Sequence, residues 1–449
     1  EAGTHSGGVD RRRVIQELEA QLARTPKALR PHEHAALAYR LGLAHAEAPA
    51  GNPEVGLRKA LSYFDVAATI FDPRYDPVEH ARVLNGAGAA HRGLGDRARA
   101  ARLFEQAGEL LEQQGRDDER AGVLNNLGLV RAELGQLELA AAACDVAVDL
   151  FDRTSAEGRR GRIAALHTRG MAHGALGTDE GLQAALADYR QAAAEIELEE
   201  APYHHGLVQH SLGTTYSALA VRQPGERGRL LAEAVAAFEE SLTVFTRRAF
   251  PFQHALAKHN LGLAYAGLGG VTNLRRALAG FEDSVAALHP QVHADAWKQA
   301  YASMERVEKE LEQRFPGQSR AGHFVALVAA CDVEERRALL HERIVRIMDL
   351  PVENRRRSAL TELALASAGL GREDARVVME AELSVLIELP SDQLETGLRA
   401  RLDAHRRLDD EDIREEADRT FDQAISDALQ GPQRIAVRDL LYSTGWERP

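Results

Sequence analysis

Histidine is the residue type here with the strongest potential to bind a metal ion, and it occurs in two short clusters. The first is His32-Glu33-His34, and in the second His204 and His205 precede His210. Side chains two residues apart point to different faces of a helix, so the two histidines of the first cluster are poorly placed to share one ion. In the second cluster, His205 and His210 are five residues apart and no cysteine or aspartate joins them. We predict no metal site.

The cysteines and the glycine-rich turns offer no catalytic chemistry. Two cysteines cannot build a disulfide framework or a zinc site. Cys144 takes the large-residue position of a repeated helix pattern and Cys331 follows the apolar run 325–330, so we expect both to be packed thiols. The turn 267–270 lacks the Lys-Ser/Thr pair of a phosphate-binding loop, and we find no serine-nucleophile or kinase motif. We therefore predict no catalytic residue and no cofactor.

Composition narrows the classes of function further. The 449 residues include 68 acidic and 55 basic side chains, a net charge of −13 that disfavours binding to nucleic acid. No apolar run approaches the ~20 residues that a membrane span needs, and no signal-peptide core is present, so we expect a cytoplasmic protein. Residues 1–8 read as a flexible tail.

Glycine recurs at intervals of 40 to 49 residues, usually followed three residues later by histidine or tyrosine. Self-similarity with such a period is the mark of a repeat architecture. The interval from the end of one copy to the next glycine is nearly constant, so the sequence variation falls in the loop inside each copy, as at Gly51-Asn52-Pro53 and 223–226. The repeated glycines are Gly42, Gly88, Gly128, Gly170, Gly213 and Gly262.

Each of these glycines is followed by a second pattern, Ala-x3-large-x2-small. Positions i, i+4 and i+7 lie on one helix face, where small residues let a neighbouring helix approach and the large residue fills the gap. The six triplets are Ala60/Phe64/Ala67, Ala100/Phe104/Ala107, Ala140/Cys144/Ala147, Ala185/Tyr189/Ala192, Ala234/Phe238/Ser241 and Ala277/Phe281/Ser284.

The two patterns together resemble the tetratricopeptide repeat (TPR) family, whose Leu-Gly-x2-Tyr signature stands here as Leu212-Gly213-x2-Tyr216 and Leu261-Gly262-x2-Tyr265. The resemblance covers residues 30–290 and implies a right-handed superhelical solenoid of about six helix-turn-helix repeats, each longer than the usual ~34 residues. Residues 242–251 leading into 259–265 also look like arrays associated with CHAT-type proteases, although we find no protease His/Cys dyad.

In such solenoids the first helix of each repeat lines the concave face, so the resemblance implies where a partner would bind. The residue three positions before each repeat glycine forms one column of hydrogen-bonding side chains, joined by two neighbouring asparagines. Asparagine can both donate and accept, which suits the backbone of an extended peptide. The predicted groove residues are Tyr39, Asn85, Asn125, Asn126, His167, His210, His259 and Asn260.

Two further expectations concern charge in this groove. Arg82, Arg92 and Lys258 are scattered, so a clamp for a carboxylate is not expected. If the three histidines of the column lie on one surface, their protonation near pH ~6.5 would raise affinity for acidic peptides as pH falls from 8 to 6. The alternative is that the column is an ordinary wet surface.

The remaining chain reads as helical but has no recognised family. We predict an all-α protein divided into residues 1–29 (tail and first helix), 30–290 (six repeats), 291–316 (capping helix) and 317–449 (C-terminal helical domain). Within the last region, 348–351 and 387–390 repeat a Leu-Pro ending 39 residues apart, which suggests two helical hairpins of one type.

Three functions fit these observations. The first is a non-catalytic scaffold or adaptor that binds a protein or peptide partner in the concave groove. The second is a peptide- or ligand-sensing regulator whose C-terminal helical domain responds. The third is an enzyme subunit with a site in 317–449. Neither a nucleic acid nor a membrane is an expected partner, and homo-oligomerisation is left open.

Overall fold

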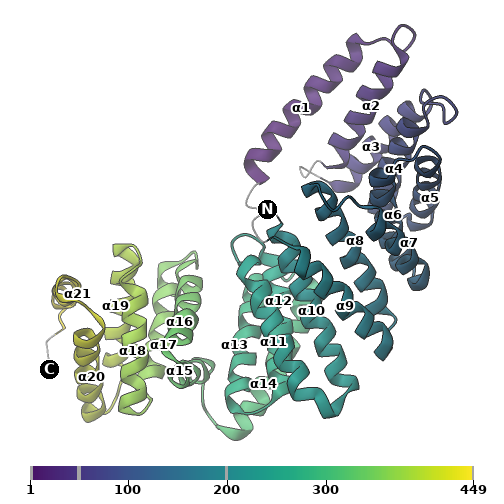
Figure 1. The fold of residues 1–449 in the computed structure, drawn as a ribbon. Coiled ribbons are helices and arrows are strands. Elements are labelled where there is room, and N and C mark those ends of the chain that lie inside the picture. The colour runs from purple at the N-terminus through teal and green to yellow at the C-terminus, as the bar shows by residue number, and fades with distance from the viewer. Residues whose placement is uncertain (1–3, 48–51, 198–200, 447–449) are drawn as a thin grey trace. The chain divides into compact units, whose positions relative to one another are not determined.

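The computed structural model describes residues 4–47, 52–197 and 201–446, with side chains from Arg12 onward. Helices are the only regular structure in these segments (Figure 1). They form two compact units, one of residues 1–268 with 283–297 and one of residues 269–282 with 298–449. The all-α class predicted from the sequence is confirmed.

The first unit is a TPR-like solenoid in which consecutive helices pack as pairs, and the first helices of neighbouring copies also contact one another. The helix α1 precedes the first copy, and the pairs α2–α3 to α10–α11 form copies one to five. The bounds are α1 Thr4–Arg24, α2 Pro31–Ala46, α3 Pro53–Ala68, α4 Pro77–Gly93, α5 Arg97–Gln113, α6 Asp117–Glu133, α7 Leu137–Leu150, α8 Ala156–Ala175, α9 Asp179–Glu195, α10 Pro202–Arg222, the 3-10 turn Pro224–Glu226, α11 Arg227–Val244 and α12 Pro251–Leu268. The next helix, α13 Val271–Ala287, is divided between the two units.

One expectation for the N-terminus is wrong, because the predicted tail is helical from Thr4 onward. Further along α1, Ile15, Leu18 and Leu22 pack on the apolar face of α2, and this contact holds the helix that residues 4–8 extend. Of the predicted insertion loops, Gly51 lies outside the described residues. Asn52 caps α3 by accepting from Glu54, and residues 223–226 do form a turn.

Five of the six repeat glycines, Gly42, Gly88, Gly128, Gly170 and Gly213, lie against the large residue of the second helix of their copy. A Cβ atom on Gly42, Gly170 or Gly213 would lie 2.5–2.6 Å from the ring of Phe64, Tyr189 or Phe238. Contacts under 3 Å are not tolerated, so only glycine lets the two helices of a copy close on each other. In copy three the filler is Cys144, whose sulfur would lie 2.3 Å from a Cβ on Gly128.

A hydrogen bond that sequence reasoning missed joins the first helix of three copies to the segment just before it. His34, His80 and His254 each stand three residues after a proline that begins a helix, and Nδ1 of each donates to the carbonyl nine residues earlier, at 2.7, 2.7 and 2.9 Å. Because a carbonyl can only accept, Nδ1 carries the hydrogen in these histidines. The hydrogen bond therefore fixes the first turn of α2, α4 and α12 relative to the chain segment that precedes it.

The second unit has a different packing order, in which each helix contacts chiefly the next but one. The helices α16, α18 and α20 begin at Val333, Arg372 and Glu411, so the 39-residue period recurs at three helix starts, where the sequence suggested two hairpins. The bounds are α14 Ala294–Arg314, α15 Arg320–Ala330, α16 Val333–Met348, α17 Glu353–Ala368, α18 Arg372–Leu386, α19 Ser391–Arg406, α20 Glu411–Ala428 and α21 Gly431–Ser443.

The acidic run 409–412 has a structural role at the start of α20. Asp410 caps this helix, and its carboxylate accepts hydrogen bonds from the backbone of Asp412 and Ile413. This fits the preference for negative charge at a helix N-terminus. Across the described segments, every helix is too short or too polar to cross a bilayer.

Candidate functional site

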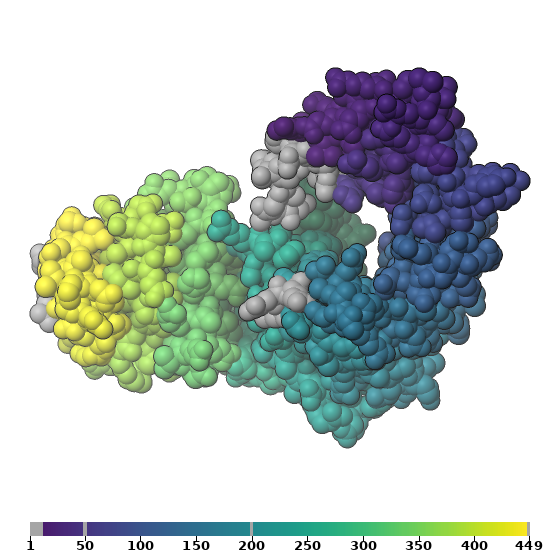
Figure 2. Space-filling model, turned by 45° about the horizontal axis from the view of Figure 1, so that its top comes forward, coloured from purple at the N-terminus to yellow at the C-terminus, as the bar shows by residue number. Residues whose placement is uncertain are grey.

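A pocket of about 820 Å³ opens chiefly on the first helices of copies one to four, and copy five adds His204 to its lining. In Figure 2 the copies of the first unit, coloured purple to teal, curve around a hollow. The lining combines small and apolar residues, here called the floor, with residues that carry amides and charges, here called the walls. The lining residues are Tyr39, Ala81, Arg82, Asn85, Leu111, Asp118, Glu119, Gly122, Val123, Asn125, Asn126, Phe151, Ser155, Glu157, Gly158, Arg160, Gly161 and His204.

Two asparagines of the predicted column, Asn85 and Asn125, and the neighbouring Asn126 all line the pocket. Asn126 donates from Nδ2 to Oδ1 of Asn85, at 3.0 Å, and so ties α6 to α4. Oδ1 of Asn125 is buried and accepts no hydrogen bond from the described residues. A buried acceptor without a donor costs free energy, so a turn of the Asn125 side chain toward the N–H group of a ligand would give up no hydrogen bond at this oxygen and would gain one.

Gly122 leaves the floor of the pocket open. It stands inside α6, where glycine is unfavourable relative to alanine by roughly 0.5–1 kcal/mol. A Cβ here would meet nothing within 4 Å, in contrast to the repeat glycines. Packing therefore does not require this glycine. The other copies carry a side chain six residues before their repeat glycine, namely Ala36, Arg82, Ala164, Leu207 and Leu256.

The cations that the sequence placed near the groove are all paired. Arg82 donates to Glu119 at 2.6 and 3.0 Å, and this bond is the main reason why the pKa of the Glu119 carboxyl is lowered. Arg92 pairs with Glu133 of the next copy at 2.6 Å, and Lys258 lies 3.6 Å from Asp283. Arg82 and Arg92 therefore join neighbouring copies.

The start of α8 supplies the part of the pocket rim that the sequence reading missed. Ser155 caps this helix by accepting from Gly158, and Glu157 and Arg160 in its first turns are exposed. Burial, and secondly the charge of Arg160, lowers the pKa of His204, which α10 contributes. None of these residues stands three positions before a repeat glycine. The sequence pattern therefore did not indicate that they lie beside the asparagines.

The histidines of the column lie outside this pocket. His167 is 8% exposed, and its Nε2 lies 3.0 Å from Oγ of Ser211. Nδ2 of Asn260 lies 3.2 Å from Nε2 of His210. Burial lowers the pKa of both His167 and His210 to about 4. Neither gains a proton between pH 8 and 6, so the predicted rise in affinity for acidic peptides cannot come from them. His259 also does not line the pocket.

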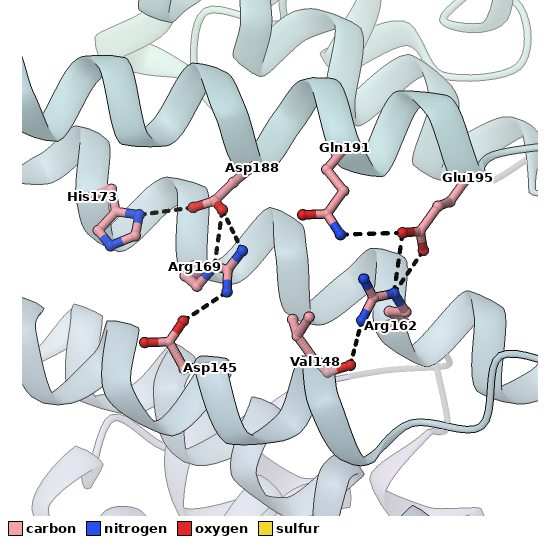
Figure 3. Close-up of polar contacts among 8 residues, drawn as sticks. All are labelled: Asp145, Val148, Arg162, Arg169, His173, Asp188, Gln191 and Glu195. Atoms are coloured by element: carbon pink, nitrogen blue, oxygen red, sulfur yellow. Dashed lines mark hydrogen bonds and ion pairs between the residues drawn. The ribbon is translucent and has the colours of Figure 1, made fainter.

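Ionic contacts behind the pocket hold α8 against its neighbours (Figure 3). The almost fully buried Arg162 donates to the carboxylate of Glu195 on α9 and to the carbonyl of Val148 on α7. Arg169, two turns later, pairs with Asp188 on α9 at 2.6 Å. Such pairs are costly to break once buried, so they fix the helix that carries the pocket rim.

The side chains first considered for metal binding are engaged elsewhere. His32 lies 3.1 Å from Asp76, and His205 lies 2.8 Å from Glu240. Within the described residues no three His, Cys, Asp or Glu side chains converge as a metal site would require.

The two thiols are packed, as the sequence indicated. Burial is the main cause that raises the pKa of Cys144 to about 12 and that of Cys331 to about 11. A thiol with such a pKa is not a nucleophile at neutral pH.

Comparison with known proteins identifies no family. Neither the protein-family models nor the curated proteins contain a match. Among solved structures the chain is similar to the human IFIT1 dimer with PPP-AAAA, at 14% identity over 84% of this chain and 73% of that chain, with a TM-score of 0.38. It is also similar to the Rap conjugation gene regulator of the plasmid pLS20 in complex with the Phr* peptide, at 13% identity over 88% and 96%, with a TM-score of 0.37. At such scores these similarities carry no conclusion about function.

Proposed function

We propose that the protein is a non-catalytic scaffold that binds an extended segment of a protein or peptide partner in the pocket of copies one to four. The observation that carries the proposal is the pairing of an open floor at Gly122 with the buried, unpartnered Oδ1 of Asn125 three residues later. A backbone N–H of an extended segment supplies the missing donor, and a small side chain fits above the glycine.

The polar walls support a segment rather than a drug-like apolar ligand. Asn85 and Asn126 are already oriented by their mutual hydrogen bond, so they present fixed donors and acceptors without further ordering. Exposed Glu157 and Arg160 offer charges of both signs at the rim. In this proposal the partner lies along α4, α6 and the start of α8.

Four predicted groove residues lie outside the pocket, and they stay predictions for a partner that extends beyond it. They are His167, His210, His259 and Asn260. The resemblance to CHAT-associated arrays, the sensing regulator and the enzyme subunit gain no observation from the described residues and stay predictions.

The test is selection of short random peptides on the full chain, followed by affinity measurement with Gly122→Leu. Leucine fills the floor of the pocket and, being a better helix former, does not destabilise α6. We expect binding to fall by at least about tenfold, the worth of one good contact. Gly228→Leu is the matched control, because Gly228 also has open space above it but lies in α11, outside the pocket.

Two outcomes would reject the proposal. One is that no peptide is enriched over an unrelated helical protein. The other is that the enriched peptides bind Gly122→Leu as well as they bind the unmodified chain and Gly228→Leu.

A further inference from the structure

A second pocket, of about 430 Å³, lies between α1 and α2, and three arginines line it. Arg24 is the last residue of α1, Arg30 stands immediately before α2, and Arg40 is in the third turn of α2. All three side chains are exposed, and they enter the lining of one pocket from three separate points of the backbone. Glu33 belongs to the same lining. The pocket shares no lining residue with the one proposed to bind a segment.

These positive charges are poorly compensated. Neither Arg24 nor Arg40 forms an ion pair within the described part of the chain, and Arg30 pairs only with Glu33, at 3.3 Å. Both partners of that pair are more than half exposed, so the pair is weak and exchangeable. Three like charges that line one pocket repel each other, and this repulsion is relieved when an anion binds among them.

The guanidinium group also suits a particular ligand geometry. Its planar fork donates two parallel hydrogen bonds to the oxygens of a carboxylate or a phosphate. An apolar base is present as well, since Ala36 and the buried Leu37 belong to the lining.

We infer that this pocket, defined by Arg24, Arg30 and Arg40, binds a compact ligand that carries two or more anionic oxygen groups, either carboxylates or phosphates. The inference is independent of the proposed function, because it concerns different residues. A nucleic acid is not the intended ligand, since the chain as a whole carries a net charge of −13.

The test is isothermal titration calorimetry of the full chain with citrate and, separately, with pyrophosphate, at an ionic strength kept constant with sodium chloride. We expect saturable binding at one site. Arg24→Gln and Arg40→Gln should each weaken it about tenfold, since each removes a charge-assisted hydrogen bond. The exposed Arg102→Gln on α5 is the matched control and should leave affinity unchanged.

The two probes separate the two sources of the anion. Binding of citrate alone supports a carboxylate ligand, binding of pyrophosphate alone supports a phosphate ligand, and binding of both supports the shared chemistry. Absence of saturable heat with both probes overturns the inference. A loss with Arg102→Gln equal to that with Arg24→Gln also overturns it, because it would show attraction to general surface charge.

Discussion

Oδ1 of Asn85 on α4 accepts a hydrogen bond from Nδ2 of Asn126 on α6, 3.0 Å away and 41 residues later in the sequence. Two asparagines from neighbouring copies thus orient each other in the wall of the pocket. Asn125, the next residue on α6, is left with its buried oxygen unpaired. The geometry therefore separates Asn126, whose amide is engaged in the wall, from Asn125, whose oxygen has no donor among the described residues.

Asn126→Ala should lower the free energy of unfolding by about 1 kcal/mol, the usual net value of a hydrogen bond whose partner keeps access to water. Urea denaturation followed by circular dichroism measures this change. Gln106→Ala, an exposed amide on α5, is the control and should change stability by less than about 0.5 kcal/mol. Equal effects of the two substitutions would show that the asparagine pair contributes nothing to stability.

Gly128→Ala should destabilise the protein by about 1–3 kcal/mol, because the new methyl group overlaps the sulfur of Cys144 at 2.3 Å. Gly122→Ala, in the same helix but with open space above it, should be neutral or stabilising by up to about 1 kcal/mol. The same glycine-to-alanine change should thus lower the melting temperature at position 128 and leave it unchanged or raise it at position 122. Melting curves of the two variants test which glycine is needed for packing.

A double-mutant cycle sharpens that prediction. The double variant Gly128→Ala/Cys144→Ala lacks the sulfur and so has space for the new methyl group. It should lose less stability than the two single substitutions lose in total. Strict additivity of the two substitutions would contradict direct contact between these positions.

The fold could be predicted from the sequence because its signals are local. The triplet Ala100/Phe104/Ala107 and its equivalents fix a helix face within eight residues, and the repeat glycines fix the partner of each face. The helix ends at Pro351 and Pro390 follow from backbone sterics alone. Such features do not depend on how the copies are arranged in space, so they can be predicted from the sequence alone.

The candidate site could be predicted only in part. Counting from the repeat glycines aligned Asn85 with Asn125, because equivalent positions of neighbouring copies meet in space. The same count could not distinguish them from His167, whose burial depends on Ser211 and on the helices packed around it. Glu157 and Arg160 were missed because they stand at the start of α8, outside the counted column.

Stability should fall as pH falls from about 6.5 to about 4. Burial holds the pKa of His167 and His210 at about 4 in the folded chain, below the ordinary value of 6.5. In this window the unfolded chain binds more protons than the folded chain does. Each histidine therefore lowers the free energy of unfolding by roughly 3 kcal/mol when the pH reaches about 4. Above pH 6.5 both are neutral in either state and the effect is absent.

Carboxylates also titrate in acid, so this prediction is tested as a difference between two proteins. Unfolding free energies of the unmodified chain and of His167→Gln/His210→Gln should converge as pH is lowered, because the variant lacks the two proton-binding groups. Parallel curves between pH 7 and 4 would refute the assignment.

In the second unit, Glu382→Gln should destabilise the region around α18 and α19 by about 3 kcal/mol. Arg401 is only 1% exposed, and its guanidinium donates to Glu382, to Ser367 and to the carbonyl of Ala364. The glutamine removes the compensating charge and leaves a buried cation.

Arg401→Met/Glu382→Leu removes both charges and should be neutral or stabilising. Hydrogen exchange of the peptides that span 372–406 reports the opening free energy locally. If the double substitution is as damaging as Glu382→Gln, the pair stabilises the fold by more than mutual compensation of charge.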